Sequence, residues 1–281
     1  MSRVVVVGAG TMGSGIAHVF AQSGWDVAMV DTAQSVLDRA LETMRKNLDR
    51  QVRKGSLTSD AAASAVSRVS VGTTLDGTGA DLAVEAVIED SDVKRRVFRD
   101  LDAALPPAAT LASNTSSISI TALAAATRRP AQVIGMHFMN PVPVMPLVEV
   151  IRGRETSDAT TERVVAIAQA LGKRPVVVRD SPGFVANRVL MPMINEAVFC
   201  VMEGVAAPED VDAVMKLGMS HPLGPLALAD LIGLDVCLAI LQVLHRDLKD
   251  DKYRPAPLLA QLVAAGRLGK KSGHGFYVYR D

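Results

Sequence analysis

The stretch from Gly135 to Val150, GMHFMNPVPVMPLVEV, places a histidine, an asparagine and a glutamate among apolar residues and prolines. His137 could move a proton, because the reference pKa of imidazole, about 6.5, allows proton exchange near neutral pH. Glu149 could hydrogen-bond the other ring nitrogen, which would fix the tautomer and favour the imidazolium. The stretch therefore predicts an acid–base pair. The alternative is a hydrogen-bonded core histidine and a separate surface acid.

A second chemical pattern, Gly8-Ala-Gly-Thr-Met-Gly13, follows the apolar run Val4–Val7 and precedes a helical stretch. The first glycine permits a tight turn, the second lets backbone approach phosphates, and the third lets helix pack on strand. The helix N-terminus offers unpaired N–H groups and a positive dipole end to a pyrophosphate. Asp31, at the end of the next expected strand, would bind ribose hydroxyls and repel a 2′-phosphate. The pattern predicts NAD as the cofactor and hydride transfer as the chemistry. The residues expected to contact it here are Gly8, Ala9, Gly10, Thr11, Met12, Gly13 and Asp31.

The elements that must position these groups alternate short apolar runs with helix-length segments, which is typical of a parallel sheet covered by helices. Expected strands are Arg3–Val7, Trp25–Asp31, Leu82–Ile88, Thr110–Ser113, Val133–Phe138, Leu147–Ile151 and Pro175–Arg179. The polar segment from Thr32 to about Arg68 interrupts this rhythm and predicts a protruding pair of helices. His137 and the glycine run then lie at carboxyl ends of strands, where ligands of open α/β sheets bind.

After Asp180 the strand signals stop, and the apolar spacing becomes helical with breaks at Gly204, at 221–225 and at 254–257. The chain therefore predicts an α/β fold. It has a Rossmann-type doubly wound sheet with a helical-pair protrusion over residues 1–181, followed by an all-helical domain over residues 182–281. We expect the first domain to bind NAD. We expect the second to bind substrate and to form a homodimer or higher homo-oligomer, because its apolar content is high for a lone small bundle.

Composition limits the possible functions. The 281 residues carry 30 basic and 30 acidic side chains, and a net charge of zero argues against a nucleic-acid binder. No apolar run has the length of a signal peptide or a membrane span, so we expect no membrane partner. The two cysteines, Cys200 and Cys237, match no metal-ligand spacing and suit a reduced compartment. These features predict a cytoplasmic protein without a metal site.

Six ordered motifs resemble the L-3-hydroxyacyl-CoA dehydrogenases. They are Gly8–Gly13, Val84-Glu-Ala-Val-Ile-Glu89, Ser113-Asn-Thr-Ser-Ser117, His137-Phe-Met-Asn-Pro-Val-Pro143, Ser181-Pro-Gly-Phe-Val-Ala-Asn-Arg188 and Gly269-Lys-Lys-Ser-Gly-His-Gly-Phe-Tyr277. The likeness extends from residue 3 to residue 279. In length the chain is similar to the stand-alone bacterial 3-hydroxybutyryl-CoA dehydrogenases rather than to the multifunctional β-oxidation proteins. The resemblance implies NAD-dependent interconversion of an (S)-3-hydroxyacyl-CoA and a 3-oxoacyl-CoA.

The resemblance also implies roles for single residues. His137 matches the catalytic histidine and Glu149 its carboxylate, while Ser116 and Asn187 match residues that hold the 3-oxygen of the substrate and neighbouring groups. Matches to cofactor-binding positions are Asp31, Glu89, Lys94, Ser116, Asn140 and Lys271. Asn47 and Lys54 fall where the family's protrusion contacts coenzyme A. His221, before Pro222, is similar to the hydroxybutyryl-type members and implies a four-carbon acyl group.

Several of these residues have simpler alternatives. Ser116 and Ser117 could cap a helix starting near Ile118, and Asn187 could be a polar face residue. Lys46, Arg50, Arg53 and Lys54 recur on one side of a helix, which suits coenzyme A phosphates but also a solvated face. At the level of function, the alternatives are a dehydrogenase of a sugar acid such as L-gulonate and a non-catalytic NAD-binding protein.

Overall fold

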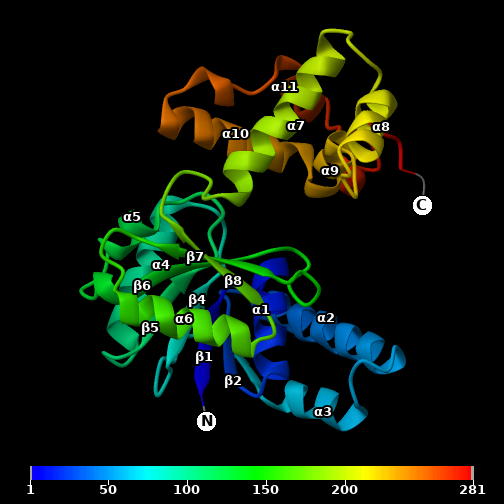
Figure 1. Cartoon of the computed structure of the whole chain (residues 1–281). Helices are drawn as coiled ribbons and strands as arrows, with labels where there is room; N and C mark the ends of the chain where they lie inside the picture. Colours follow the sequence, from blue (N-terminus) through cyan, green and yellow to red (C-terminus); the bar gives the residue numbers. More distant parts are fainter. Residues whose placement is uncertain (1, 280–281) are drawn as a thin grey trace. The chain divides into compact units, whose positions relative to one another are not determined.

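The computed structural model describes residues 2–279. The chain divides into two compact units, Met1–Ser181 and Pro182–Asp281. Figure 1 shows that the first unit is a sheet flanked by helices and that the second is built of helices.

One sheet of eight strands organises the first unit. The strands are β1 (Arg3–Val7), β2 (Asp26–Val30), β3 (Val69–Gly72), β4 (Leu82–Glu85), β5 (Thr110–Ser113), β6 (Val133–Phe138), β7 (Leu147–Arg152) and β8 (Arg174–Arg179). Their order is β3-β2-β1-β4-β5-β6-β7-β8. All neighbouring pairs are parallel except β6 and β7, which are antiparallel. Strands β1 to β3 extend the sheet in one direction, and strands β4 to β8 extend it in the other. The switch point therefore lies between β1 and β4, and open α/β sheets bind ligands at such a point.

Helices cover this sheet and extend beyond it (Figure 1). They are α1 (Thr11–Gln22), α2 (Gln34–Arg53), α3 (Ser59–Ser67), α4 (Ser91–Ala104), α5 (Ile120–Ala124), the 3-10 turn η1 (Pro130–Gln132) and α6 (Asp158–Ala170). Helices α2 and α3 are the protruding pair that the polar composition of 32–68 predicts. Only one stripe of α2 is apolar, and its buried residues Leu37, Ala40, Met44 and Leu48 recur at helical spacing.

The largest core cluster joins alternate strand residues to helices α1, α2, α3 and α6. Its fully buried members include Val4 and Val6 of β1, Ile16 and Phe20 of α1, and Val164 of α6. Helices α4 and α5 pack against β4, β5 and β6 with side chains outside this cluster, such as Phe98 and Leu123. Burial of both faces explains why the central strands read as continuous apolar runs.

The predicted fold class is confirmed, but β3 is a strand that the sequence pattern does not predict. Residues Val69–Gly72 form only four sheet positions at the sheet edge, and none of them is fully buried. Ser70 and Gly72 break the apolar run, so the hydrophobic signal is weak there.

The second unit is helical, with α7 (Ala186–Met202), α8 (Pro208–Gly218), α9 (Pro225–Ile232), α10 (Leu234–Leu248), η2 (Asp251–Tyr253), α11 (Pro257–Ala264) and η3 (Lys270–Ser272). The three predicted breaks separate these helices. A fourth break, at Gly233 with a φ of 106°, divides α9 from α10 and was not predicted. Buried Asp230 of α9 accepts hydrogen bonds from the amides of Phe276 and Tyr277, which fixes the closing segment to the helices.

Within residues 2–279, no single helix is long and apolar enough to cross a membrane. Helices α9 and α10 reach that length and hydropathy only as a pair, and the pair is bent by 98°.

Candidate active site

The glycine turn between β1 and α1 is shaped by close approaches of the backbone. Gly8 has a φ of 98°, and a Cβ there would lie 2.6 Å from the carbonyl oxygen of Ala86. A Cβ on Gly13 would lie 1.7 Å from the carbonyl oxygen of Gly8, so α1 can approach the turn only at a glycine. Gly10 differs, because nothing lies within 4 Å of its Cβ position. Packing requires Gly8 and Gly13, while the space beside Gly10 is open to a ligand.

A pocket of ≈ 770 Å³ lies beside this turn. Among the predicted cofactor residues, Gly8, Gly10, Thr11, Met12 and Asp31 line it. Its other wall is apolar, with Val87 and Ile88 after β4 and Val93 and Val97 of α4. Ala9 lines a neighbouring pocket instead. The combination of an open glycine backbone, an acid and an apolar wall fits a dinucleotide.

Asp31 joins the glycine turn to the end of β2. Its Oδ2 accepts a hydrogen bond from the amide of Ala9 at 2.8 Å, and its Oδ1 accepts one from the amide of Ala33 at 3.3 Å. The carboxylate therefore has a fixed place in the pocket wall, from which its charge opposes a 2′-phosphate.

His137 and Glu149 face each other across the antiparallel strands β6 and β7, where they form a register pair. The Nδ1 atom of His137 lies 2.8 Å from Oε2 of Glu149, and the two residues are 6% and 2% exposed. The amide of Phe138 donates to Oδ1 of Asn114 at 2.9 Å, which ties the end of β6 to the segment after β5. Glu149 is therefore not a surface acid, and the predicted pairing of the two side chains is present.

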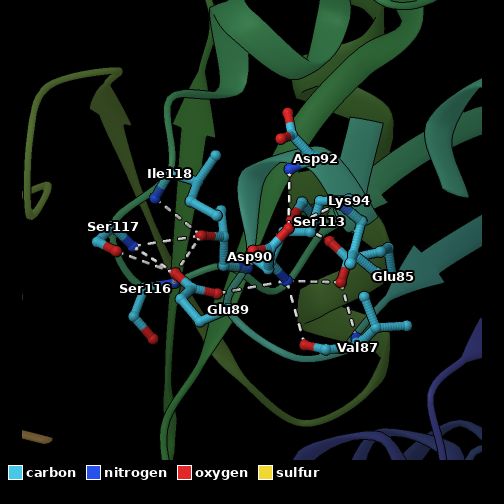
Figure 2. A network of polar contacts seen from close by, with 12 residues as sticks. Glu85, Val87, Glu89, Asp90, Asp92, Lys94, Ser113, Ser116, Ser117 and Ile118 are labelled. Atoms are coloured by element: carbon cyan, nitrogen blue, oxygen red, sulfur yellow. Dashed lines mark hydrogen bonds and ion pairs between the residues drawn. The ribbon is translucent and has the colours of Figure 1, made fainter. Parts of the chain in front are cut away.

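The turn that carries Ser116 is held by one carboxylate, that of Glu89. Figure 2 shows the Glu89 side chain among the backbone and hydroxyl groups of this turn. Its Oε1 accepts from the Thr115 hydroxyl at 2.5 Å and from the amides of Ser116 and Ser117 at 2.9 and 3.0 Å. The serines do not cap the next helix, since α5 starts at Ile120 and its N-cap is Ser119, which accepts from the Ala122 amide at 3.2 Å. The suggested capping role of Ser116 and Ser117 was wrong.

Lys94 lies beneath this turn and is 1% exposed. Its ammonium contacts Glu85 at 2.6 Å and Glu89 at 3.3 Å. Glu85 is fully buried at the end of β4, and the hydroxyl of Ser113 donates to it at 2.6 Å. Neither residue is among the predicted site residues. The available signal was an acid closing a buried strand, because such a charge needs a cation partner.

The loop between β6 and β7 carries Asn140, which is exposed. Asn140 and Asn47 of α2 line a pocket of ≈ 380 Å³, together with Arg39 and Thr43. Lys173 supports this loop from below, since its ammonium donates to the carbonyl oxygens of Val142 at 2.5 Å and of Met145 at 2.9 Å. Lys173 was not recognised from the sequence.

The basic side of α2 is exposed throughout, at Lys46, Arg50, Arg53 and the C-cap residue Lys54. Lys46 contacts Glu42 at 2.6 Å, and Lys54 lies outside the lining of the pocket that contains Asn47. The structure therefore brings Asn47 and Asn140 together but not Asn47 and Lys54.

Two predicted site residues belong to the helical unit. Asn187, the second residue of α7, is 8% exposed and is therefore not a polar surface residue. Lys271 contacts Asp235 of α10 at 2.5 Å. Within residues 2–279 no group of three or more histidine, cysteine or acidic side chains could hold a metal ion.

A mostly parallel sheet with an open glycine turn at its switch point, an acid after β2 and a histidine–carboxylate pair on β6 and β7 is the arrangement expected of an NAD-dependent oxidoreductase. Residues 3–181 match the family model described as 3-hydroxyacyl-CoA dehydrogenase, NAD binding domain. Residues 183–279 match the model for the C-terminal domain of the same enzymes. The chain belongs to the 3-hydroxyacyl-CoA dehydrogenase family.

The similarity to known relatives extends over nearly the full length of this chain. A probable 3-hydroxybutyryl-CoA dehydrogenase of Deinococcus radiodurans is 58% identical and covers 98% of this chain and 99% of its own. One from Bacillus subtilis is 54% identical and covers 100% and 98%. The crystal structure of (S)-3-hydroxybutyryl-CoA dehydrogenase from Ralstonia eutropha superposes with a TM-score of 0.96 at 50% identity, covering 100% of both chains. The predicted family, enzyme class and cofactor are confirmed: the chain is an NAD-dependent oxidoreductase that acts on 3-hydroxyacyl-CoA.

Proposed function

We propose that this chain interconverts (S)-3-hydroxybutyryl-CoA and acetoacetyl-CoA. The His137–Glu149 pair at the dinucleotide-binding edge of the sheet is the observation that carries the proposal. The four-carbon preference is supported by the names of full-length relatives and by His221, which precedes Pro222. Asp31 supports NAD over NADP, because it has a fixed place in the pocket wall.

In the direction of oxidation, the Nε2 atom of His137 takes the proton of the 3-hydroxyl group. NAD, which the glycine turn and Asp31 would hold, would supply the hydride acceptor that conversion of the C3 alcohol to a ketone requires. Glu149 holds Nδ1 of the ring, which selects the tautomer with Nε2 as the base and stabilises the imidazolium that forms. In reduction, the same imidazolium returns the proton to the 3-oxygen.

Ser116 and Asn187 orient the 3-oxygen of the substrate and the groups beside it. Asn140 serves the nicotinamide side of the cofactor, and Glu89 and Lys271 belong to the cofactor side of the site. Coenzyme A follows the pocket that Asn47, Arg39 and Asn140 line, and its phosphates approach Lys54 and the other exposed cations of α2.

Residues 1–181 act as the NAD-binding domain, and residues 182–281 bind substrate and form a homodimer or a higher homo-oligomer. The helical unit exposes Val189, Val214 and Leu217 by 67%, 61% and 86%, which supports an interface there. The protein works in the cytoplasm and needs neither nucleic acid nor membrane as a partner. Light scattering during gel filtration would measure the number of subunits, and a monomer would refute this part.

The function is tested by following NADH oxidation with acetoacetyl-CoA, with longer 3-oxoacyl-CoA substrates and with NADPH in place of NADH. We expect the highest kcat/KM for acetoacetyl-CoA with NADH. A preference for longer chains would overturn the four-carbon assignment. Oxidation of L-gulonate, with no turnover of any acyl-CoA, would favour the sugar-acid alternative.

The acid–base role is tested with His137→Gln. We expect kcat to fall by roughly 10²–10⁴-fold, the usual contribution of a positioned acid–base group. NADH binding, measured by fluorescence, should stay within about twofold, since the glycine turn is untouched. Turnover near that of the wild type would remove His137 as the base.

A further inference from the structure

Three charged side chains form a compact cluster at the carboxyl edge of β4. Lys94 of α4 is 1% exposed and Glu85 is 0% exposed, whereas the Glu89 side chain is 40% exposed. The ammonium bridges the two carboxylates at 2.6 and 3.3 Å. An ion buried this deeply is stable only with charged or well-aligned hydrogen-bonding partners, so the three groups depend on one another.

Both carboxylates lead to the turn that carries Ser116 (Figure 2). Glu85 accepts a hydrogen bond from the Ser113 hydroxyl at 2.6 Å. The Oγ atom of Ser113 in turn accepts one from the Thr115 amide at 3.1 Å. Glu89 accepts from the Thr115 hydroxyl, from the two serine amides and from the Ser117 hydroxyl, the last at 3.1 Å. Lys94 therefore closes a ring of hydrogen bonds whose far side is the backbone of residues 115–117.

The amine of Lys94 faces into this ring. Besides the carboxylates, it donates to the carbonyl oxygen of Val87 at 3.3 Å. These three oxygens match the three N–H donors of an ammonium. With only 1% of the residue exposed, Lys94 has almost no surface with which to contact a dinucleotide.

We propose that Lys94 is a positioning residue for the substrate-binding serine: it holds Glu85 and Glu89 together, and Glu89 fixes the backbone that presents Ser116. The inference rests on the proposed function, because it deepens the role of Ser116 in binding the 3-oxygen. The role of Lys94 then differs from the cofactor contact that the family resemblance implies, because Lys94 supports the substrate-binding turn.

The charge state of Glu89 agrees with this arrangement. Burial acts to raise the pKa of its carboxyl group, but the Lys94 charge and the hydrogen bonds from Thr115, Ser116 and Ser117 outweigh burial and lower that pKa. Glu89 thus stays ionised at neutral pH and acts only as an acceptor, which two neighbouring amides require.

The first test measures the turn itself, without activity. Hydrogen exchange of the Ser116 and Ser117 amides is compared in the wild type, in Lys94→Met and in Glu89→Gln. We expect at least about tenfold faster exchange in both variants, because a lost bond worth 1.4 kcal/mol corresponds to a factor of ten. Glu89→Gln leaves the buried Lys94–Glu85 pair intact, so it remains informative if Lys94→Met folds poorly. Unchanged protection in a folded Lys94→Met would overturn the proposal whatever the activity.

The second test separates positioning from cofactor binding by steady-state kinetics with acetoacetyl-CoA and NADH. We expect Lys94→Met to lower kcat by on the order of 10²-fold, because a displacement of about 1 Å is enough for such a loss. NADH affinity should stay within about twofold. A higher KM for NADH with an unchanged kcat would instead mean direct contact with the cofactor and would refute the proposal.

A double-variant cycle shows through which residue Lys94 acts. If Lys94 works by placing Ser116, Lys94→Met should add little to the loss caused by Ser116→Ala, and additive losses would count against it. If Ser116→Ala alone turned over like the wild type, the proposed role of Ser116 would fail, and the exchange data would still decide the Lys94 claim. Arg95→Met is the matched control: it removes a cation of the same helix whose partner Asp92 is exposed and 3.7 Å away, and we expect no change.

Discussion

Two buried lysines support the two loops on either side of His137, and they do so in different ways. Lys94 holds the Ser116 turn through the carboxylates of Glu85 and Glu89. Lys173 holds the loop of Asn140 through two neutral carbonyl oxygens, those of Val142 and Met145. Both residues are at least nine-tenths buried, so the contrast lies in the partners rather than in the depth.

The difference shows what each ammonium depends on. Lys94 neutralises Glu85, whose charge would otherwise be buried without a cation, so this carboxylate and the ammonium depend on each other. Within residues 2–279, the hydrogen-bond partners of the Lys173 ammonium are carbonyl oxygens and include no carboxylate, and burial lowers the pKa of its amine. We therefore expect the Ser116 turn to fail when its cation is lost, and the Asn140 loop to tolerate the loss better.

The largest effect on stability is expected for Lys94→Met. The change leaves Glu85 buried without its cation, which costs about 3–5 kcal/mol for a buried pair. Urea unfolding of the wild type and the variant measures this difference. Adding Glu85→Gln to Lys94→Met removes one of the two repelling charges and should recover part of the loss. A loss below about 1 kcal/mol would show that this ion pair contributes no more than an exposed one. The proposed difference between Lys94 and Lys173 would then be wrong.

Lys173→Met should cost less, about 1–3 kcal/mol, because it leaves two carbonyl oxygens without a donor but no unpaired charge. The same urea experiment measures it, with Arg174→Met as the exposed neighbour expected to stay within about 0.5 kcal/mol. If Lys173→Met destabilised the protein more than Lys94→Met, the charge of the partners would not explain the difference in stability between the two variants.

The sequence was sufficient for the fold because its signals are strong and local. The run Val4–Val7 before the glycines, the two buried strands around His137 and Glu149, and the change to helical spacing after Asp180 each follow from hydrophobic periodicity. The edge strand Val69–Gly72 was not predicted, because none of its residues is fully buried and its hydrophobic pattern is weak. A strand of that kind is set by its neighbour β2 more than by its own residues.

The site was predictable to a smaller degree. The glycine turn and the His137–Glu149 pair follow from motifs in which spacing along the chain determines spacing in the fold. Lys94 and Lys173 show what spacing cannot give, since their partners come from other elements and meet them only after folding. In the sequence Lys173 is an ordinary charged residue, and only its burial in the fold shows that it must have partners.

The smallest effect expected is a pH dependence that belongs to Lys173 alone. Because burial lowers its pKa in the folded protein, the unfolded chain binds more protons than the native one between that lowered value and 10.5. Stability should therefore rise with pH across this window, whereas below it both states are protonated and the cost of burying the charge acts in full. Nearby His18 stays neutral there, since burial lowers its pKa from 6.5. The measurement is the difference in unfolding free energy between wild type and Lys173→Met, followed from neutral pH up to 10.5. A difference that shrinks as pH rises would mean that the carbonyl oxygens stabilise the ammonium more than burial destabilises it, which would make the two lysines alike.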